Sequence, residues 1–360
     1  MTLPRVLVIG GYGGFGARLS RRLAGDGWQV LVAGRNAAKA RAVAAGLTHA
    51  VGLAVDRNAE LAPVLREYRP LLVIDTAGPF QGSSYAVPQA CIAAGVNYLD
   101  LADGRDFVCR IGALDQEARA AGIAVISGAS SVPALSGAVV RSLTHGLPRI
   151  ERIELAISAS DRAVAGTSVA VAILSYAGQR FVLRHGGTWA SAVGWHGLRR
   201  VRYALPGVKP LRRVVALVDV PDLELLPERV RGEPDVSFRA GPEFAVQVLG
   251  IWLLSWLVTW RVVRSLAPLA PVLLHLQRLT GWACSDRSAM MVEVSSGATQ
   301  RRWTLIAGRG TGPEVPTLAA QLLARAILAG NLVAGARDAG EELTLEEFAP
   351  LFTELGIVTS

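Results

Sequence analysis

The first 130 residues alternate short apolar runs with stretches of helical character. Val6–Ile9 is a continuous apolar run, which is typical of a strand buried on both faces, and Gly14–Ala24 reads as a helix closed by Gly25. Further strands are predicted at Trp28–Ala33, His49–Val55, Leu71–Asp75, Val96–Leu99 and Ile123–Ile126. Helices are predicted between them at Ala37–Ala45, Ala59–Tyr68, Ser84–Ala94 and Ile111–Ala121. This alternation predicts an α/β fold, a Rossmann-type doubly wound parallel sheet.

The regular alternation of predicted strands and helices ends after Gly128, and a mixed α+β pattern follows. Strands are predicted at Glu151–Ser158, Val214–Val218, Val292–Val294 and Arg302–Ile306, and helices at Val169–Leu183, Thr317–Ala329 and Leu345–Leu355. A chain of 360 residues is long enough for two domains. We predict a dinucleotide-binding domain over residues 1–130 with a C-terminal return over 312–360. An inserted α+β domain for substrate binding or dimerisation is predicted over 131–311.

One apolar segment of the second domain admits three interpretations. Phe244–Trp260 is 17 residues without a charge, and it lies within an apolar stretch over 244–274. It could be a buried helix, pocket-lining or at a dimer contact. Its tryptophans and the following Arg261 and Arg264 also suit a helix in peripheral membrane contact. A spanning helix needs about 20 apolar residues. We expect a cytoplasmic protein with no obligatory transmembrane helix, and membrane association through this segment stays open.

Charge and composition exclude several classes of partner. The net charge is +8 and comes almost entirely from arginine, with one local cluster over residues 199–213. No nucleic-acid motif or basic stripe interleaved with aromatic residues accompanies it, so no nucleic-acid partner is expected. The three cysteines and five histidines are dispersed, so neither a metal site nor a disulfide framework is predicted.

The strongest chemical signal is the glycine-rich segment Gly10–Gly16. It contains GxGxxG at Gly11, Gly13 and Gly16, after a predicted strand and at the start of a predicted helix. These glycines would allow a tight turn, close approach of a pyrophosphate, and close packing of helix on strand. We predict that the cofactor binds along this loop, at Gly11, Tyr12, Gly13, Gly14, Phe15 and Gly16. A glycine-rich turn without a ligand is the alternative.

The following strand ends indicate which dinucleotide binds. Sites that prefer NAD usually carry an acid at the end of the second strand, where this chain has Arg35 and Asn36. Arg35 could hold the 2′-phosphate of NADP(H) or be a solvated surface residue. Asp56 could reach the adenine or cap a helix. The loop Thr76, Ala77, Gly78 and Pro79 could border the nicotinamide ribose or only form a turn.

These segments resemble the saccharopine dehydrogenase-like family of NADP-binding oxidoreductases. The resemblance rests on Gly10–Gly16, Ala33–Arg35, Asp75–Phe80, Tyr98–Gly104, Gly128–Pro133, Ser285–Arg287 and Gly312–Pro316, and the last two look like bacterial members of unassigned substrate. It implies a Rossmann domain, an inserted α+β domain and, often, homodimers. The chain departs from the amine-forming reductases of the family, because Ser130 stands near their acidic residue and Ala134 follows Pro133.

Candidates for contact with a small-molecule substrate lie in two loops at the carboxyl ends of strands. Asp103 could be an acid or substrate anchor, or a turn residue before Gly104. Ser130 and Ser131 could be proton donors, but the pattern favours loop or helix-cap residues. No tyrosine has a lysine four residues later, so the short-chain dehydrogenase pair is absent, and no catalytic residue is named. We predict an NADP(H)-dependent oxidoreductase acting on an unidentified carbonyl, imine or alkene of hydrophobic character. The alternative is a non-catalytic NADP-binding sensor or membrane-associated scaffold.

Overall fold

A computed structural model describes residues 3–162, 167–280 and 284–360, which divide into two compact units. Unit 1 comprises residues 1–135 and 314–343, and unit 2 comprises residues 136–313 and 344–360. Each unit has its own sheet and its own hydrophobic clusters.

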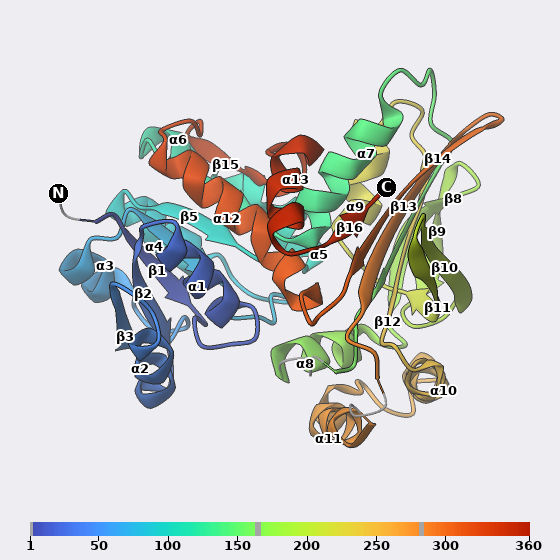
Figure 1. The fold of residues 1–360 in the computed structure, drawn as a ribbon, viewed down its shortest axis with the longest axis horizontal. Coiled ribbons are helices and arrows are strands. Elements are labelled where there is room, and N and C mark those ends of the chain that lie inside the picture. Colours follow the sequence, from blue (N-terminus) through green and yellow to red (C-terminus); the bar gives the residue numbers. More distant parts are fainter. Residues whose placement is uncertain (1–2, 163–166, 281–283) are drawn as a thin grey trace. The chain divides into compact units, whose positions relative to one another are not determined.

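Unit 1 is built on seven parallel strands in the order β15-β6-β5-β4-β1-β2-β3 (Figure 1). The strands are β1 (Arg5–Ile9), β2 (Gln29–Gly34), β3 (Ala50–Ala54), β4 (Leu72–Asp75), β5 (Asn97–Asp100), β6 (Ala124–Ser127) and β15 (Gly335–Asp338). The helices are α1 (Gly16–Gly25), α2 (Ala37–Ala45), α3 (Ala62–Tyr68), α4 (Ala86–Ala94), α5 (Arg105–Cys109), α6 (Asp115–Ala120) and α12 (Val315–Leu328). The first six strands follow the Rossmann order, which confirms the predicted fold class.

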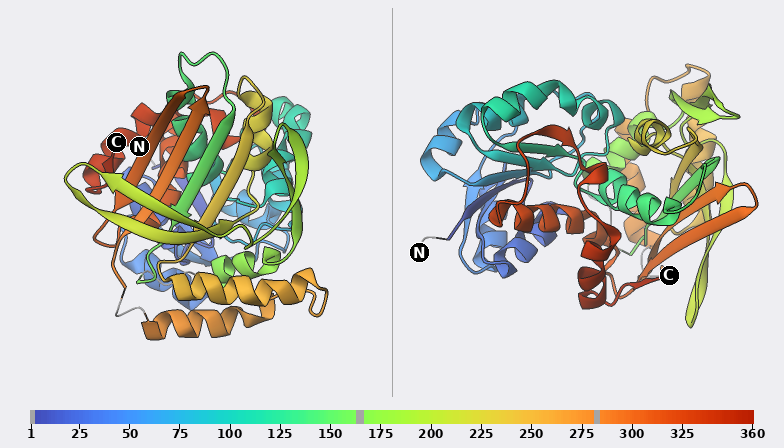
Figure 2. Two further views of the ribbon diagram at one scale, coloured as in Figure 1. Left: turned by 90° about the vertical axis from the view of Figure 1, so that its right-hand side faces the viewer. Right: turned by 90° about the horizontal axis from the view of Figure 1, so that it is seen from above.

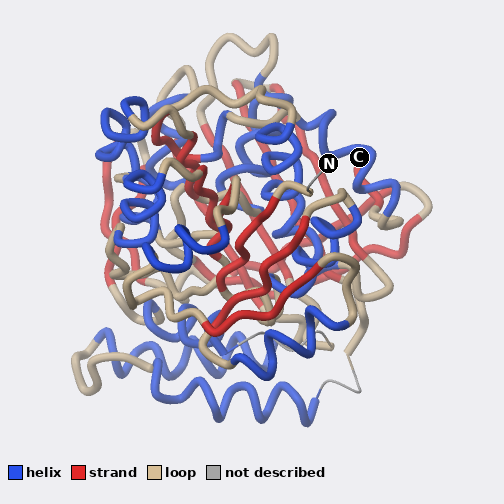
Figure 3. The backbone as a smooth tube through the Cα atoms, turned by 90° about the vertical axis from the view of Figure 1, so that its left-hand side faces the viewer, coloured by secondary structure: helices blue, strands red, loops and turns tan. Residues whose placement is uncertain are grey.

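Strand β1 lies at the centre because it pairs with β2 on one side and with β4 on the other. Its residues Val6–Ile9 are at most 1% exposed, in keeping with a strand covered on both faces. Figure 3 shows helices on either side of neighbouring strands. The chain reverses its direction of travel across the sheet between β1 and β4. In open α/β sheets, the crevice at such a switch point, beyond the carboxyl ends of the strands, is where ligands bind.

The returning helix α12 is held on α1 by charged and polar side chains. Asp26 accepts two hydrogen bonds from Arg325, at 2.8 and 2.7 Å, and one from Gln321 at 3.0 Å. Arg22 Nε lies 2.9 Å from Glu314 Oε2. Strand β15 then pairs with β6 and extends the sheet. Residues 314–343 therefore complete unit 1.

Unit 2 contains a mixed seven-stranded sheet in the order β10-β11-β12-β7-β13-β14-β16 and a separate β8-β9 hairpin (Figure 2). The strands are β7 (Arg152–Ser158), β8 (Arg180–His185), β9 (Thr188–Val193), β10 (Arg199–Leu205), β11 (Val208–Leu217), β12 (Asp235–Gly241), β13 (Ser288–Ser296), β14 (Thr299–Ala307) and β16 (Val358–Thr359). The helices are α7 (Ser136–Thr144), α8 (Thr167–Tyr176), α9 (Asp222–Arg229), α10 (Ala245–Thr259), α11 (Ala270–Thr280) and α13 (Leu345–Glu354).

The structure differs from the prediction at the C-terminus. The predicted return to the first domain ran over 312–360, whereas residues 344–360 lie in unit 2. Strand β16 pairs with β14, and Ser360 Oγ accepts a hydrogen bond from Thr304 N at 3.0 Å. The Phe352 ring lies 6.3 Å from the Trp303 ring, centroid to centroid. These contacts, invisible in a local pattern, hold the end of the chain on the second sheet.

The helix predicted over Val169–Leu183 was wrong in its second half. Helix α8 ends at Tyr176, and Gly178 adopts a φ of 78°, which a helix does not tolerate. Strand β8 starts at Arg180 and pairs with β9. The hairpin β8-β9 was not predicted, because its strands alternate exposed and buried positions only weakly. Strand β10 was also not predicted, although Val201, Tyr203 and Leu205 alternate with exposed residues along it.

Candidate dinucleotide site at the glycine-rich loop

The glycine-rich loop turns the chain sharply from β1 into α1. Gly10 has a φ of 76°, a conformation that side chains disfavour. The Gly11 amide donates to Ala33 O at 3.0 Å, so the loop is tied to β2. A Cβ on Gly16 would lie 2.6 Å from Thr76 Oγ1 and would overlap Gly10 O. The absence of side chains thus lets α1 begin directly over the ends of β1 and β4.

The N-terminus of α1 has donors available for an anion. No side chain caps this helix, and within the described ranges the amides of Gly14 and Phe15 donate to no protein acceptor. Gly14 is exposed, and a Cβ built on it would meet nothing within 4 Å. Free amides at a helix N-terminus, with open space before them, suit a phosphate group. The loop can therefore accept the pyrophosphate of a dinucleotide.

The two polar residues that follow β2, Arg35 and Asn36, have different roles. Asn36 Oδ1 accepts a hydrogen bond from Lys39 N at 3.0 Å and caps α2, and its own amide donates to Tyr12 Oη at 3.1 Å. The Tyr12 ring lies against Gly34, where a Cβ would collide with it. Arg35 is exposed, and its guanidinium has no ion-pair or hydrogen-bond partner in the part of the chain that the structure describes. Arg35 is therefore available to an anionic group.

Arg57 is a polar residue of this edge that the sequence analysis missed. Its neighbour Asp56 forms an exposed turn, in which Oδ1 accepts from Asn58 N at 3.0 Å. Arg57 instead points inward and lies 3.0 Å from Asp75 Oδ2. It also donates to Ala77 O at 2.7 Å, and its guanidinium carbon is 4.8 Å from the centroid of the Phe80 ring. Arg57 thus fixes the loop after β4. The one sequence signal that could have indicated this role is its position just after the end of a predicted strand.

Asp75 and Asp100 are buried carboxyl groups at the ends of adjacent strands. They occupy paired positions in β4 and β5, and both are 0% exposed. Burial raises the pKa of Asp75 to about 7, against the opposing effects of Arg57 and the Ala77 amide. Burial likewise raises the pKa of Asp100 to about 6, although hydrogen bonds from Gly128 N, Ala102 N and Ser127 Oγ lower it. Carboxyls that keep their protons toward neutral pH place less negative charge beside the phosphate loop.

The loop after β4 is close to the glycine-rich loop. Thr76 donates to Ile9 O through both its amide and its hydroxyl, each at 2.8 Å. A Cβ on Gly10 would lie 2.8 Å from Thr76 Oγ1 and 3.0 Å from Ala77 N. The structure therefore brings Thr76 and Ala77 to the loop, and Gly78 and Pro79 follow them at a cis peptide bond.

The substrate-facing candidates occupy the next two loops. Asp103 is exposed and accepts a hydrogen bond from Gln81 Nε2 at 3.2 Å, which joins it to the loop after β4. Ser131 is buried at the start of a short helical turn, and the Ser130 amide donates to Gly128 O at 2.7 Å. Asp100 connects these loops, because its carboxylate accepts from both Ala102 N and Gly128 N. None of the three candidates has a contact that assigns it a proton-transfer role.

The segment Ser285–Arg287 has a structural role in unit 2. Ser285 donates to Glu243 Oε1 through its hydroxyl at 2.7 Å and its amide at 3.1 Å. Arg213 of β11 lies 2.9 Å from the same oxygen. This partly buried ion pair holds the segment against β11 and the start of α10.

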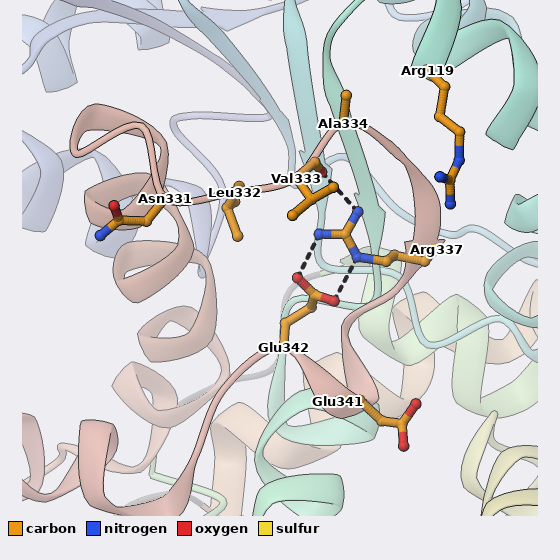
Figure 4. A pocket seen from close by; sticks show the side chains of 8 residues that line it. All are labelled: Arg119, Asn331, Leu332, Val333, Ala334, Arg337, Glu341 and Glu342. Atoms are coloured by element: carbon orange, nitrogen blue, oxygen red, sulfur yellow. Dashed lines mark hydrogen bonds and ion pairs between the residues drawn. The ribbon is translucent and has the colours of Figure 1, made fainter.

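Unit 1 also has a surface pocket of about 370 Å³, which contains none of the residues of the glycine-rich loop (Figure 4). It is lined by Arg119, Asn331, Leu332, Val333, Ala334, Arg337, Glu341 and Glu342. The Arg337 guanidinium makes two hydrogen bonds to the Glu342 carboxylate, at 2.6 and 2.7 Å, and one to Val333 O (Figure 4). The pocket lies where the chain enters β15, the amino end of a parallel strand, whereas the glycine-rich loop lies at the carboxyl ends. It contains no predicted site residue.

The fold and the glycine-rich loop define a Rossmann-type dinucleotide-binding protein. Residues 6–126 match the sequence model of the saccharopine dehydrogenase NADP binding domain. This match lies within the first domain and covers less than half of the chain; it confirms the resemblance for that domain and the expectation of NADP(H) as its cofactor. No curated protein matches the chain.

Two solved structures share the fold over nearly the whole chain. An apo histidine-tagged saccharopine dehydrogenase (L-Glu forming) from Saccharomyces cerevisiae has a TM-score of 0.62 and 14% identity, and the match covers 99% of each chain. An amine dehydrogenase from Mycobacterium smegmatis has a TM-score of 0.52 and 10% identity, and the match covers 94% of this chain and 95% of that one. At these identities, the likeness concerns the fold.

Proposed function

We propose that the protein is an NADP(H)-dependent oxidoreductase that acts on a small molecule bearing a carbonyl, imine or alkene group. The observation that supports it most directly is the open N-terminus of α1, with the free amides of Gly14 and Phe15, in an NADP-binding domain. A bound nicotinamide supplies hydride transfer to or from an electrophilic carbon. The chain's own residues bind the phosphates, orient the ring and shape the substrate site.

The proposal assigns the 2′-phosphate to Arg35. This side chain is exposed at the end of β2 and has no protein partner among the described residues, so a phosphate would not have to displace an ion pair. Lys39 is also exposed and lies in the first turn of α2, where it adds a second positive charge near Arg35 in the sequence. A charge-assisted hydrogen bond contributes about 1.5–3 kcal/mol, which corresponds to a preference for NADPH over NADH of roughly tenfold or more.

Titration of NADPH and NADH by fluorescence tests the assignment. Arg35→Asp should weaken NADPH binding by about tenfold or more and leave NADH binding less affected. Arg66→Asp is the matched control, because Arg66 is an exposed arginine in the last turn of α3, toward the amino ends of the strands. Equal affinities for the two dinucleotides, or an unchanged preference in Arg35→Asp, would contradict the role of Arg35.

Catalysis is tested separately, by loss of reduced-nicotinamide absorbance with a panel of aldehydes, ketones, imines and enones. Turnover with at least one class supports the oxidoreductase. Tight NADPH binding without turnover on any class would refute it and favour the non-catalytic sensor.

A further inference from the structure

Helix α10 carries apolar residues all round, but its own domain covers only one side of it. Val248, Ile251 and Val258 are buried against α8, β11 and the segment before α11. On the other side Val246 is 70% exposed and Leu253 is 65% exposed. Figure 2 shows α10 running alongside α11 at one end of the unit. We name as the α10–α11 face the large exposed apolar side chains of these two helices and of the segment that joins them: Val246, Leu249, Leu253 and Leu254 of α10, Trp260, Val262 and Leu269 of the joining segment, and Val272 of α11.

The charged side chains within the segment that carries the α10–α11 face are of one sign, and Glu243, which directly precedes it, is paired with Arg213. The sequence has no Asp or Glu from Phe244 through Ser285. Between Ala245 and His275, every exposed side chain is apolar except Arg261, Arg264 and His275. An exposed apolar surface whose own exposed charges are arginines complements an anionic lipid surface, because the apolar side chains and the arginines both favour binding to it.

The length of α10 decides how it could meet a bilayer. Its 15 residues rise about 22 Å, which is less than the hydrocarbon thickness of about 30 Å. No helix within residues 3–162, 167–280 and 284–360 is long and apolar enough to cross a membrane. An isolated interfacial helix needs a polar face, which α10 lacks. Here the second face is instead buried in unit 2, so the helix can lie flat with one side toward lipid.

The tryptophans of α10 agree with that orientation. Trp252, Trp256 and Trp260 follow one another at intervals of one turn, with ring centroids 6.3 and 5.4 Å apart. Trp252 and Trp256 are half-buried, whereas Trp260 is 67% exposed and precedes Arg261. Tryptophan and arginine side chains favour the headgroup level of a bilayer.

We propose that the α10–α11 face docks the protein on anionic lipid membranes as a peripheral, non-spanning contact. A second copy of the chain is a poorer occupant. The segment from Phe244 through Ser285 offers no acidic residue that could pair with Arg261 and Arg264 of the other copy. The proposal does not depend on catalytic activity or on the cofactor.

Flotation of the full-length protein with lipid vesicles tests the proposal. The protein should float with vesicles of phosphatidylglycerol and phosphatidylcholine. With vesicles of phosphatidylcholine alone, the floated fraction should be at least about tenfold smaller. The double variant Val246→Glu/Leu253→Glu should lose flotation, and Arg261→Glu/Arg264→Glu should lose the preference for the anionic vesicles. The matched control is Val333→Glu, because Val333 of unit 1 is also 70% exposed and should float as the wild type does.

Far-ultraviolet circular dichroism confirms that each variant is folded, as expected for changes at exposed positions. Wild-type protein that stays unbound with both vesicle types overturns the proposal, as does a folded double variant that floats like the wild type. Sedimentation at several protein concentrations measures the oligomeric state and tests the remaining alternative, a second copy of the chain on this face. A dimer that the double variant abolishes, in a protein that does not float, would assign the face to a second copy.

Discussion

Replacing Asp75 by Asn should flatten the dependence of unit 1 stability on pH. Asp75 is fully buried at the end of β4, where its Oδ1 accepts from Ala77 N at 2.9 Å and its Oδ2 lies 3.0 Å from the Arg57 guanidinium. Burial raises its pKa from 3.8 to about 7, and the neighbouring Asp100 contributes in the same direction. An asparagine keeps the acceptor for Ala77 N and removes the titrating group.

The sign follows from the raised pKa. Between the unfolded value of 3.8 and the folded value of about 7, the native state binds the proton more tightly than the unfolded chain does. The contribution of Asp75 to stability is therefore most favourable at the acidic end of this range and is lost as the pH rises through it. The slope is at most about 1.4 kcal/mol per pH unit for one carboxyl. Over about three pKa units, the difference is on the order of 4 kcal/mol.

Urea unfolding followed by circular dichroism between about pH 5 and about pH 8 measures this slope. The wild type should lose stability as the pH rises, and Asp75→Asn should lose less, so that the variant gains on the wild type toward the alkaline end. Asp115→Asn is the control, because a hydrogen bond from Arg119 lowers the pKa of Asp115, so this carboxyl is ionised throughout the measured range and its replacement should leave the slope unchanged. Equal slopes in the wild type and Asp75→Asn would refute the reasoning and show that Asp75 is ionised in the native state.

The remaining predictions concern the glycine-rich loop. Gly13→Val should abolish NADPH binding in a fluorescence titration while the circular dichroism spectrum is kept, because Gly13 is exposed and its Cβ would meet only Gly10 O, at 3.1 Å; normal binding would show that the loop is placed wrongly. Gly16→Ala should lower the free energy of unfolding by about 1–3 kcal/mol, since the new Cβ would lie 2.6 Å from Thr76 Oγ1. Gly14→Ala, whose Cβ meets nothing within 4 Å, should leave stability nearly unchanged, and equal losses in the two variants would contradict the close packing of α1.

The sequence by itself determined the Rossmann-type architecture of the first 130 residues. Continuous apolar runs such as Val6–Ile9 and helices ended by glycines are local signals, and they set the type of each element before any long-range contact forms. The glycine spacing from Gly11 to Gly16 is equally local, because a turn and a helix start lie within one segment. The absence of an acid near Arg35 was visible for the same reason.

Only the tertiary structure decided which distant segments share a unit. Strand β15 joins β6, and β16 joins β14, through backbone pairing between residues that no local pattern relates. The pairing of Arg57 with Asp75, and of Asp75 with Asp100 across adjacent strands, likewise depends on strand order. Burial of those carboxyls, and hence their raised pKa, follows from the packing around them.

For the apolar segment Phe244–Trp260, the sequence predicted the type of element and the tertiary structure decided which of its residues are buried. Its composition predicted a helix but left open what would cover it, because a helix that is apolar all round suits a protein core and a lipid surface equally. The structure decided this by burying Val248, Ile251 and Val258 while leaving Val246 and Leu253 exposed. The physical reason is that hydropathy is a property of each residue, whereas burial is a property of the neighbours that folding brings to it.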